Sequence, residues 1–222
     1  MPTRTFDDLS EKIRTERRWR RQEVTTLLRH AHASTGALEE AALCRAGVTM
    51  LYAHWEGFVR EALCAYLEFV RYQVTVDRTS HSQLSAPWIA LSAARMIDAD
   101  IDQERCVVYL PVVEFMREGM AERPSLPEDL PVGAKSNLQY EVLARLMSVV
   151  GLEAGQYADR ELLVNERLLG RRNPIAHGTR IPVDAEELDG LMREVFSLID
   201  DIMTAIENAA ALSSHKENTP AT

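Results

Sequence analysis

One long stretch, from about residue 36 to residue 76, limits most strongly what this chain can fold into. It contains no proline, and its apolar side chains recur at the spacing of an α-helix. The stretch therefore predicts a single long helix that buries at least one face. Gly47 and Gly57 lie inside it, and each costs about 1 kcal/mol relative to alanine. Because glycine within a helix is tolerated where another backbone approaches closely, we expect this helix to face a neighbour across a tight seam.

Other segments predict further helices around the long one. Residues about 5 to 34 carry a partial apolar stripe, and a short helix is expected from Ala86 to Met96. The final helix should begin near Asp184, since Glu187 three residues later completes a capping-box pattern. Its wide apolar face predicts that it packs on the helix of residues 36 to 76.

The middle of the chain is less regular. Residues 106 to 120 fit either a strand or buried helical turns, and the prolines of residues 122 to 134 predict a loop that is mobile or contacts a partner. Ser136 is the expected N-cap of a helix that ends near Gly151. We expect one domain over residues 1–212 with this short insertion, followed by a disordered tail over residues 213–222.

Composition excludes several classes of protein. The net charge of −9 opposes indiscriminate binding to nucleic acid, because the average field repels phosphate, but it is compatible with a local basic site. Apolar runs fall short of a membrane span, and the start has no apolar signal region, so we expect a cytoplasmic protein without membrane contact. Cys44, Cys64 and Cys106 lack the spacing of a disulfide framework or a zinc site, and no cofactor or metal is expected.

The segment around residue 172 holds the clearest chemistry. Asp159 can cap a helix that breaks at Gly170. Asn173 can then cap a new turn with Pro174 at its first position, where a missing N–H costs nothing. Such a turn would aim free backbone N–H groups toward Arg172 and favour an anion such as phosphate.

Arg172 and His177 supply two functions that a metal-free phosphodiesterase needs. Arginine is a fixed positive charge with a rigid fork of donors, and histidine both accepts and donates protons near neutral pH. Asn173 adds a neutral polar group, while Arg171 and Arg180 make the segment locally basic and are candidate substrate-binding residues. The alternative is that Arg172 pairs with a carboxylate and that His177 and the following glycine end a helix.

Two further groups allow both a structural and a functional interpretation. His54 and Glu56 are either a core histidine and a helix-surface carboxylate, or supporting partners of the arginine–histidine pair. The first helix carries a basic cluster, which is either a solvated face or a surface for RNA backbone or an acidic partner. That cluster consists of Lys12, Arg14, Arg17, Arg18, Arg20 and Arg21.

The whole string from Arg171 to Gly178 resembles the signature of the HEPN superfamily (higher eukaryotes and prokaryotes nucleotide-binding), an arginine and a histidine separated by four to six residues. Residues 53–59, Ala-His-Trp-Glu-Gly-Phe-Val, resemble a stretch of its RiboL-PSP-HEPN branch. Residues 135–138, Lys-Ser-Asn-Leu, are similar to a helix start in the same branch. The three stretches occur in the family's order, and Pro174 is a departure in detail.

This resemblance implies an all-α bundle with long antiparallel helices that forms a homodimer. It implies a metal-independent endoribonuclease, often a toxin or antiphage-defence effector with an antitoxin or defence-system partner protein. Arg172 and His177 would be the catalytic pair that acts on RNA, and Asn173 the polar assistant. Because some HEPN domains are inactive, the resemblance also allows a dimeric adaptor that binds nucleotide, RNA or a partner protein.

Overall fold

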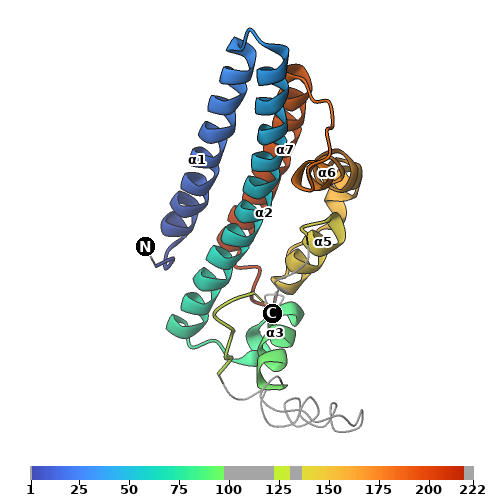
Figure 1. Cartoon of the computed structure of the whole chain (residues 1–222). Coiled ribbons are helices and arrows are strands. Elements are labelled where there is room, and N and C mark those ends of the chain that lie inside the picture. The colour runs from blue at the N-terminus through green and yellow to red at the C-terminus, as the bar shows by residue number, and fades with distance from the viewer. Residues whose placement is uncertain (1, 98–122, 131–136, 218–222) are drawn as a thin grey trace, which may run out of the picture.

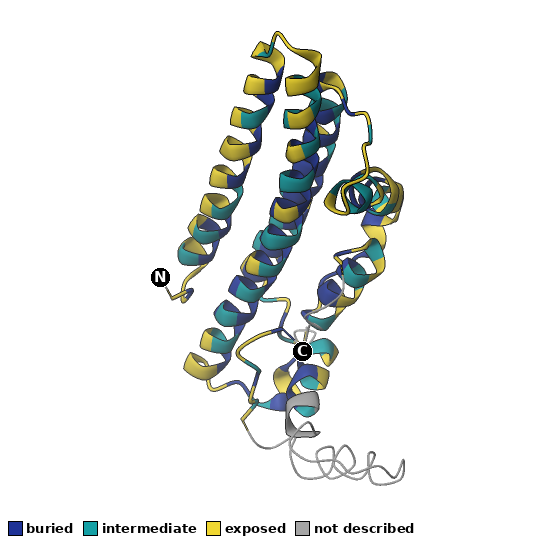
Figure 2. Ribbon diagram, viewed as in Figure 1, coloured by how far each residue is buried: buried dark blue, intermediate teal, exposed yellow. Residues whose placement is uncertain are grey.

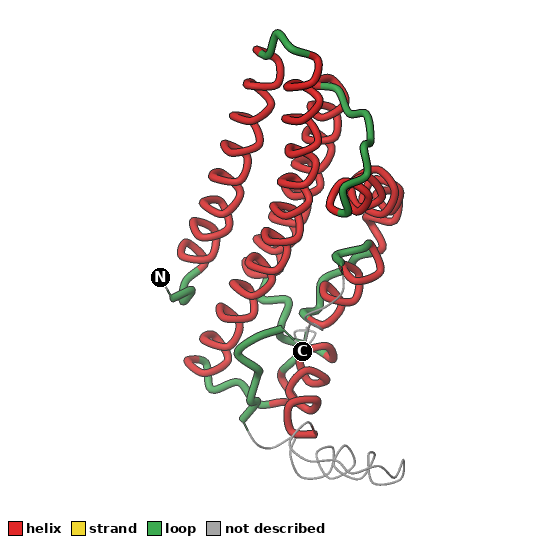
Figure 3. Tube along the Cα trace, in the orientation of Figure 1, coloured by secondary structure: helices red, strands yellow, loops and turns green. Residues whose placement is uncertain are grey.

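The computed structural model of this chain describes residues 2–97, 123–130 and 137–217. Within these ranges the regular structure is entirely helical, with one isolated β-bridge between Leu84 and Lys216, so the all-α prediction is confirmed (Figure 3). The ambiguous segment of residues 106 to 120, the expected N-cap Ser136 and Cys106 lie outside the described residues.

Three long helices form the body of the molecule: α1 (Phe6–Ala33), α2 (Ala37–Val76) and α7 (Ala185–Ala211). α1 and α2 are joined by a short turn and run antiparallel, and α7 lies beside α2 (Figure 1). Their exposed and buried residues alternate around each helix, with the buried side toward the bundle (Figure 2). The bounds of all three helices agree closely with those expected from the apolar spacing.

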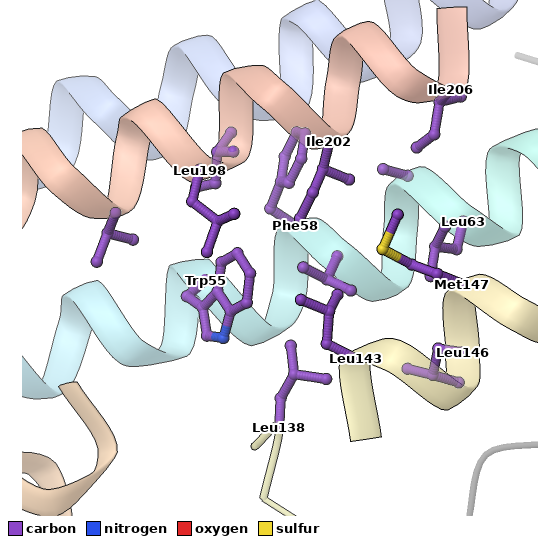
Figure 4. Packing of buried hydrophobic residues seen from close by; sticks show 14 of the residues in the cluster. Trp55, Phe58, Leu63, Leu138, Leu143, Leu146, Met147, Leu198, Ile202 and Ile206 are labelled. Atoms are coloured by element: carbon purple, nitrogen blue, oxygen red, sulfur yellow. The ribbon is translucent and has the colours of Figure 1, made fainter. Parts of the chain in front are cut away.

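The core lies between α2, α7 and α5 (Tyr140–Val149). Trp55 and Phe58 of α2 are fully buried, and they lie against Leu198 and Ile202 of α7 (Figure 4). Leu143 of α5 closes the other side of this cluster. The prediction that the long second helix packs on the final helix is therefore confirmed.

The glycines of α2 mark close approaches within the same chain. A Cβ atom at Gly47 would stand 2.5 Å from Cδ2 of Leu188 in α7, and one at Gly57 would stand 3.2 Å from Nη2 of Arg20 in α1. The expected tight seam is present. Both glycines face helices of their own chain, so they do not mark a surface for a second subunit.

Most of the basic cluster of α1 is used inside the fold. Arg17 forms a two-pronged ion pair with Asp200 of α7, and Arg14 binds Glu207 of the same helix at 3.0 Å. These pairs support the structural interpretation of the cluster, since charges held by carboxylates of the same chain are not free for RNA. The remaining pairs are those of Lys12 with Glu68 and of Arg20 with Glu16.

The N-terminal ends of α1 and α7 are both capped by side chains. Thr5 and Asp8 form a reciprocal capping box at α1. At α7, Asp184 Oδ1 accepts the backbone N–H of Glu187 at 2.8 Å, as expected. The reciprocal half of this predicted box is absent, because the Glu187 carboxylate pairs with Arg171 instead.

α5 begins later than predicted. Its first residue is Tyr140, whose backbone N–H donates to Asn165 Oδ1 at 2.9 Å. Leu138 stays outside the helix because its N–H donates to the phenol oxygen of Tyr52 at 2.8 Å. The helix ends at Val149 and is followed by Gly151 with a φ of +71°, so the predicted C-terminal end is confirmed.

The predicted break at Gly170 is wrong. A 3₁₀ segment, η3 (Gly155–Arg160), leads through a π-helix, η4 (Leu163–Leu169), into α6 (Gly170–Ala176). Pro174 lies inside α6 and not at the start of a new helix. The backbone N–H anion site expected at Asn173 is therefore not formed.

Burial explains why the helix continues through these residues. A proline inside a helix costs about 3 kcal/mol. Burying one large aliphatic side chain contributes about 1.5–3 kcal/mol, and η4 buries four: Leu163, Val164, Leu168 and Leu169. The free energy gained by burying η4 in the core thus exceeds the cost of continuing the helix through Gly170, Asn173 and Pro174.

The start of the expected disordered tail is docked on the fold. The backbone N–H of Ser85 donates to the carbonyl of His215, and that of Glu217 donates to the carbonyl of Gln83, both at 2.9 Å. Lys216 pairs with Asp77 at 2.6 Å. Residues 213–217 therefore belong to the ordered domain, a correction to its expected end at residue 212, while residues 218–222 lie outside the described residues.

His215 makes the docked tail sensitive to acid. Its side chain is fully buried, and burial lowers the pKa of His215 to about 4, compared with about 6.5 for an unfolded chain. The folded state therefore favours the neutral imidazole, and stability is lost as pH falls from about 6.5 toward 4. Between pH 7.5 and pH 5 we expect a loss of about 2 kcal/mol from this group alone.

Urea unfolding at the two pH values measures this effect. In His215→Leu the pH-dependent loss should shrink by about 2 kcal/mol relative to the wild type, whereas His32→Leu, at an exposed position of α1, should keep it. An unchanged pH dependence in His215→Leu would contradict the assignment.

Candidate functional site

Arg172 lies in the first turn of α6, with its guanidinium against α2. Its Cζ atom is 4.5 Å from the centre of the Tyr52 ring, a cation–π contact. Nη1 donates to Oδ1 of Asn173 at 2.9 Å and to Oδ1 of Asn137 at 3.3 Å. Among the described residues, the partners of Arg172 are thus two neutral amides and a ring. No carboxylate of the described residues neutralises its positive charge, in contrast to the alternative in which Arg172 pairs with a carboxylate.

Tyr52 is the part of this site that the sequence did not predict. It is fully buried in α2, and its phenol oxygen accepts the N–H of Leu138. Burial, together with the nearby Glu56 carboxylate, raises the pKa of Tyr52 to about 12. The phenol therefore stays neutral at physiological pH. The sequence signal that could have indicated Tyr52 is its position directly before the HEPN-like residues 53–59.

His177 stands at the end of the same helix as Arg172. It is the C-cap of α6, its side chain is exposed, and its backbone N–H donates to the carbonyl of Asn173 at 3.1 Å. Gly178 follows with a φ of +81°, which ends the helix in the left-handed conformation that glycine favours. The backbone role expected in the structural alternative is thus present, and it leaves the imidazole open to a ligand.

The other two arginines differ in availability. Arg171 forms an ion pair with Glu187 of α7, so its charge is neutralised within the chain. Arg180 is exposed in the loop between α6 and α7. Of these two predicted substrate-binding residues, only Arg180 presents its charge to solvent without an ion pair among the described residues.

His54 lies away from the site. Its Nε2 atom is 3.1 Å from Oε2 of Glu23 in α1, and its ring meets Trp19 edge to face. Burial lowers the pKa of His54, against the opposing influence of Glu23. The prediction of His54 as a supporting residue is therefore wrong, because this position on α2 faces α1 instead of α6. The core-histidine interpretation holds.

Glu56 reaches the site only indirectly. Its carboxylate binds Arg60 at 3.0 Å and helps to raise the pKa of the Tyr52 phenol, and the ring of Tyr52 in turn contacts Arg172. One intervening side chain thus separates Glu56 from the arginine. No three His, Cys, Asp or Glu side chains within the described ranges gather where they could hold a metal ion.

Residues of the second and third HEPN-like stretches meet around Arg172 together with the residue that precedes the first stretch. Tyr52 directly precedes the first stretch, Asn137 and Leu138 belong to the second, and Arg172 belongs to the third. A family model described as HEPN_MAE_28990-like HEPN matches residues 9–214. The chain belongs to this HEPN family. Neither a curated protein nor a solved structure matches the chain significantly.

Membership of the HEPN superfamily, expected from the three stretches, is therefore confirmed. The description of the matched family does not name the RiboL-PSP branch. A HEPN domain suggests a role in RNA cleavage or nucleotide binding. None of the described helices combines the length and the apolar character that a bilayer crossing requires.

Proposed function

We propose that this HEPN domain is a metal-independent endoribonuclease in which Arg172 and His177 form the catalytic pair and Asn173 assists. The observation that carries the proposal is the charge of Arg172: within the described part of the chain its partners are all neutral, and an exposed histidine stands at the end of the same short helix. A structural arginine in this half-buried position would normally pair with a carboxylate, whereas a phosphate-binding arginine needs its charge left free.

The proposed reaction is an internal transfer within RNA. His177 accepts the proton of a ribose 2′-hydroxyl, and that oxygen attacks the adjacent phosphorus. The bond to the 5′-oxygen of the next nucleotide breaks, and this oxygen receives a proton. The products are a 2′,3′-cyclic phosphate and a free 5′-hydroxyl. Arg172 stabilises the negative charge that builds up on the phosphate oxygens, and Asn173 holds its Nη1.

A homodimer completes this mechanism. One histidine cannot easily act as base and acid on opposite sides of one phosphate, so we propose that the partner subunit's His177 protonates the leaving oxygen. A two-fold axis beside α6 would also double the positive charge around one RNA strand. Arg180 would then contact RNA phosphates next to the cleaved bond.

We further propose that the protein acts on RNA in the cytoplasm as a toxin or antiphage-defence effector. Its partner would be an antitoxin or another protein of the same defence system. The competing hypothesis is an inactive dimeric adaptor. The net charge of −9 and the neutralisation of Arg171 by Glu187 favour that hypothesis, because both weaken attraction to RNA.

Cleavage should persist in excess EDTA and yield 2′,3′-cyclic phosphate ends. The proposed steps need only a cation and proton carriers, and Arg172 and His177 supply them. Mass spectrometry of a short RNA incubated with the protein, with and without EDTA, measures both points. A strict requirement for added magnesium or manganese would contradict the mechanism. Binding of RNA without any cleavage would favour the adaptor.

A further inference from the structure

We infer that Tyr52 is a positioning residue for Arg172: its ring fixes the plane of the guanidinium, and its hydroxyl holds the segment that carries Asn137. The inference rests on the proposed function, because it assigns Tyr52 a role in presenting the arginine to an RNA phosphate.

The contact with the Tyr52 ring compensates for an unpaired donor of Arg172. Nε of Arg172 is buried and has no hydrogen-bond partner among the described residues. A buried donor without an acceptor favours any other side-chain conformation that would expose it to water. The face of the Tyr52 ring, 4.5 Å from Cζ, offers a compensating attraction that exists only in the observed conformation.

The hydroxyl acts on the second contact of the arginine. Tyr52 Oη accepts the N–H of Leu138 at 2.8 Å, and the neighbouring Asn137 places Oδ1 at 3.3 Å from Nη1 of Arg172. Tyr52 is rigid in this role, since it is fully buried in the long helix α2. Tyr52 of α2 thus contacts the guanidinium of Arg172 with its ring, and with its hydroxyl it holds the segment whose Asn137 binds the same guanidinium.

The arrangement determines which donors remain for a ligand. The Nη1 group of Arg172 is used by Asn137 and Asn173, while the Nη2 group makes no hydrogen bond within the described ranges. With the plane of the guanidinium set by the ring, Nη2 keeps a constant direction, as catalysis by a preorganised charge requires. The ligand expected at this position is a phosphodiester oxygen.

Two substitutions separate the ring from the hydroxyl. Tyr52→Phe keeps the ring but removes the acceptor of the Leu138 N–H, and it should lower kcat for RNA cleavage by about threefold, whereas an unchanged kcat would overturn the role of the hydroxyl. Tyr52→Leu removes both the hydroxyl and the ring and should lower kcat by about 10- to 30-fold, and its difference from Tyr52→Phe measures the loss of the cation–π contact. Tyr157→Leu is the matched control, since Tyr157 is a buried tyrosine whose hydroxyl donates to the carbonyl of Asp201 in α7. It should lower stability without lowering kcat.

A second measurement does not depend on activity. The ¹H–¹⁵N signal of Arg172 Nε, assigned by its loss in Arg172→Lys, should be shifted upfield by the aromatic ring in the wild type and in Tyr52→Phe. It should move to the range of exposed arginines in Tyr52→Leu and stay in place in Tyr157→Leu. A signal that is unchanged in Tyr52→Leu overturns the inference, as does a kcat equal to that of the wild type. If the wild type cuts no RNA, the proposed function fails, while the signal still decides whether Tyr52 positions Arg172.

Discussion

Arg172→Ala and His177→Ala should each lower the rate of RNA cleavage by about 10³-fold or more, the effect typical of removing a charge or proton carrier that acts in the transition state. Arg172→Lys should also lose most activity, because lysine keeps the charge but cannot stack flat on Tyr52 or bind Asn137 and Asn173 as a planar fork. Thermal unfolding should show that all three variants stay folded.

Matched controls separate this effect from a general change of charge. Arg193→Ala removes an exposed arginine that is paired with Asp189 at 3.2 Å, and His32→Ala removes an exposed histidine of α1. Both should cleave at the wild-type rate. If Arg172→Ala and His177→Ala do so as well, the pair has a structural role only, and the adaptor hypothesis takes precedence.

Mixing of subunits extends the same test to the dimer. Excess His177→Ala chains should depress wild-type cleavage beyond simple dilution, because each active homodimer exchanges into a mixed dimer with one histidine. The rate is measured after exchange at several mixing ratios, with the Arg193→Ala chain as the neutral competitor. A wild-type protein that is monomeric by sedimentation and fully active would exclude the shared site.

Phe58→Ala should lower the free energy of unfolding by about 3–5 kcal/mol. Phe58 is fully buried where α2 meets α7, next to Ile202, and the cavity left by the ring cannot be filled by the stiff helices around it. Urea unfolding at neutral pH measures the change. Leu162→Ala is the control, since that side chain is 69% exposed and its loss should cost about 0.5 kcal/mol or less. Equal stability of the two variants would contradict the packing described for the core.

The fold could be predicted wherever a long apolar stripe dominated the local signal. The helices α1, α2 and α7 each repeat buried side chains over many turns, so their bounds agree with the sequence to within a few residues. The segment from Gly155 to Ala176 could not be predicted in the same way. There, Gly170 and Pro174 favour a break, and only the burial of η4 against the core, which involves distant residues, reverses that preference.

The site divides similarly. Arg172, Asn173 and His177 are close in sequence and form a known pattern, so the sequence was enough to single them out. Tyr52 contacts Arg172 across the fold, and no local spacing indicates that contact. The prediction that His54 supports the site was wrong for a geometric reason. His54 lies two residues after Tyr52, which turns its side chain by about 200° around α2, so Tyr52 faces α6 whereas His54 faces α1.

The π-helix η4 implies that the chain can lose one residue at this place without moving Arg172 away from α2. In η4 the N–H of Gly170 donates to the carbonyl of Asn165, five residues earlier, so each turn holds more residues than an α-helix does. Deleting one codon between Leu163 and Leu169 would allow an ordinary α-helix. Six residues of α-helix turn through nearly the same angle as the seven residues of η4, so Arg172 would stay on the side of α2 that carries Tyr52. Chains of this family should therefore occur both with the π-helix and, one residue shorter, with an ordinary α-helix at this place.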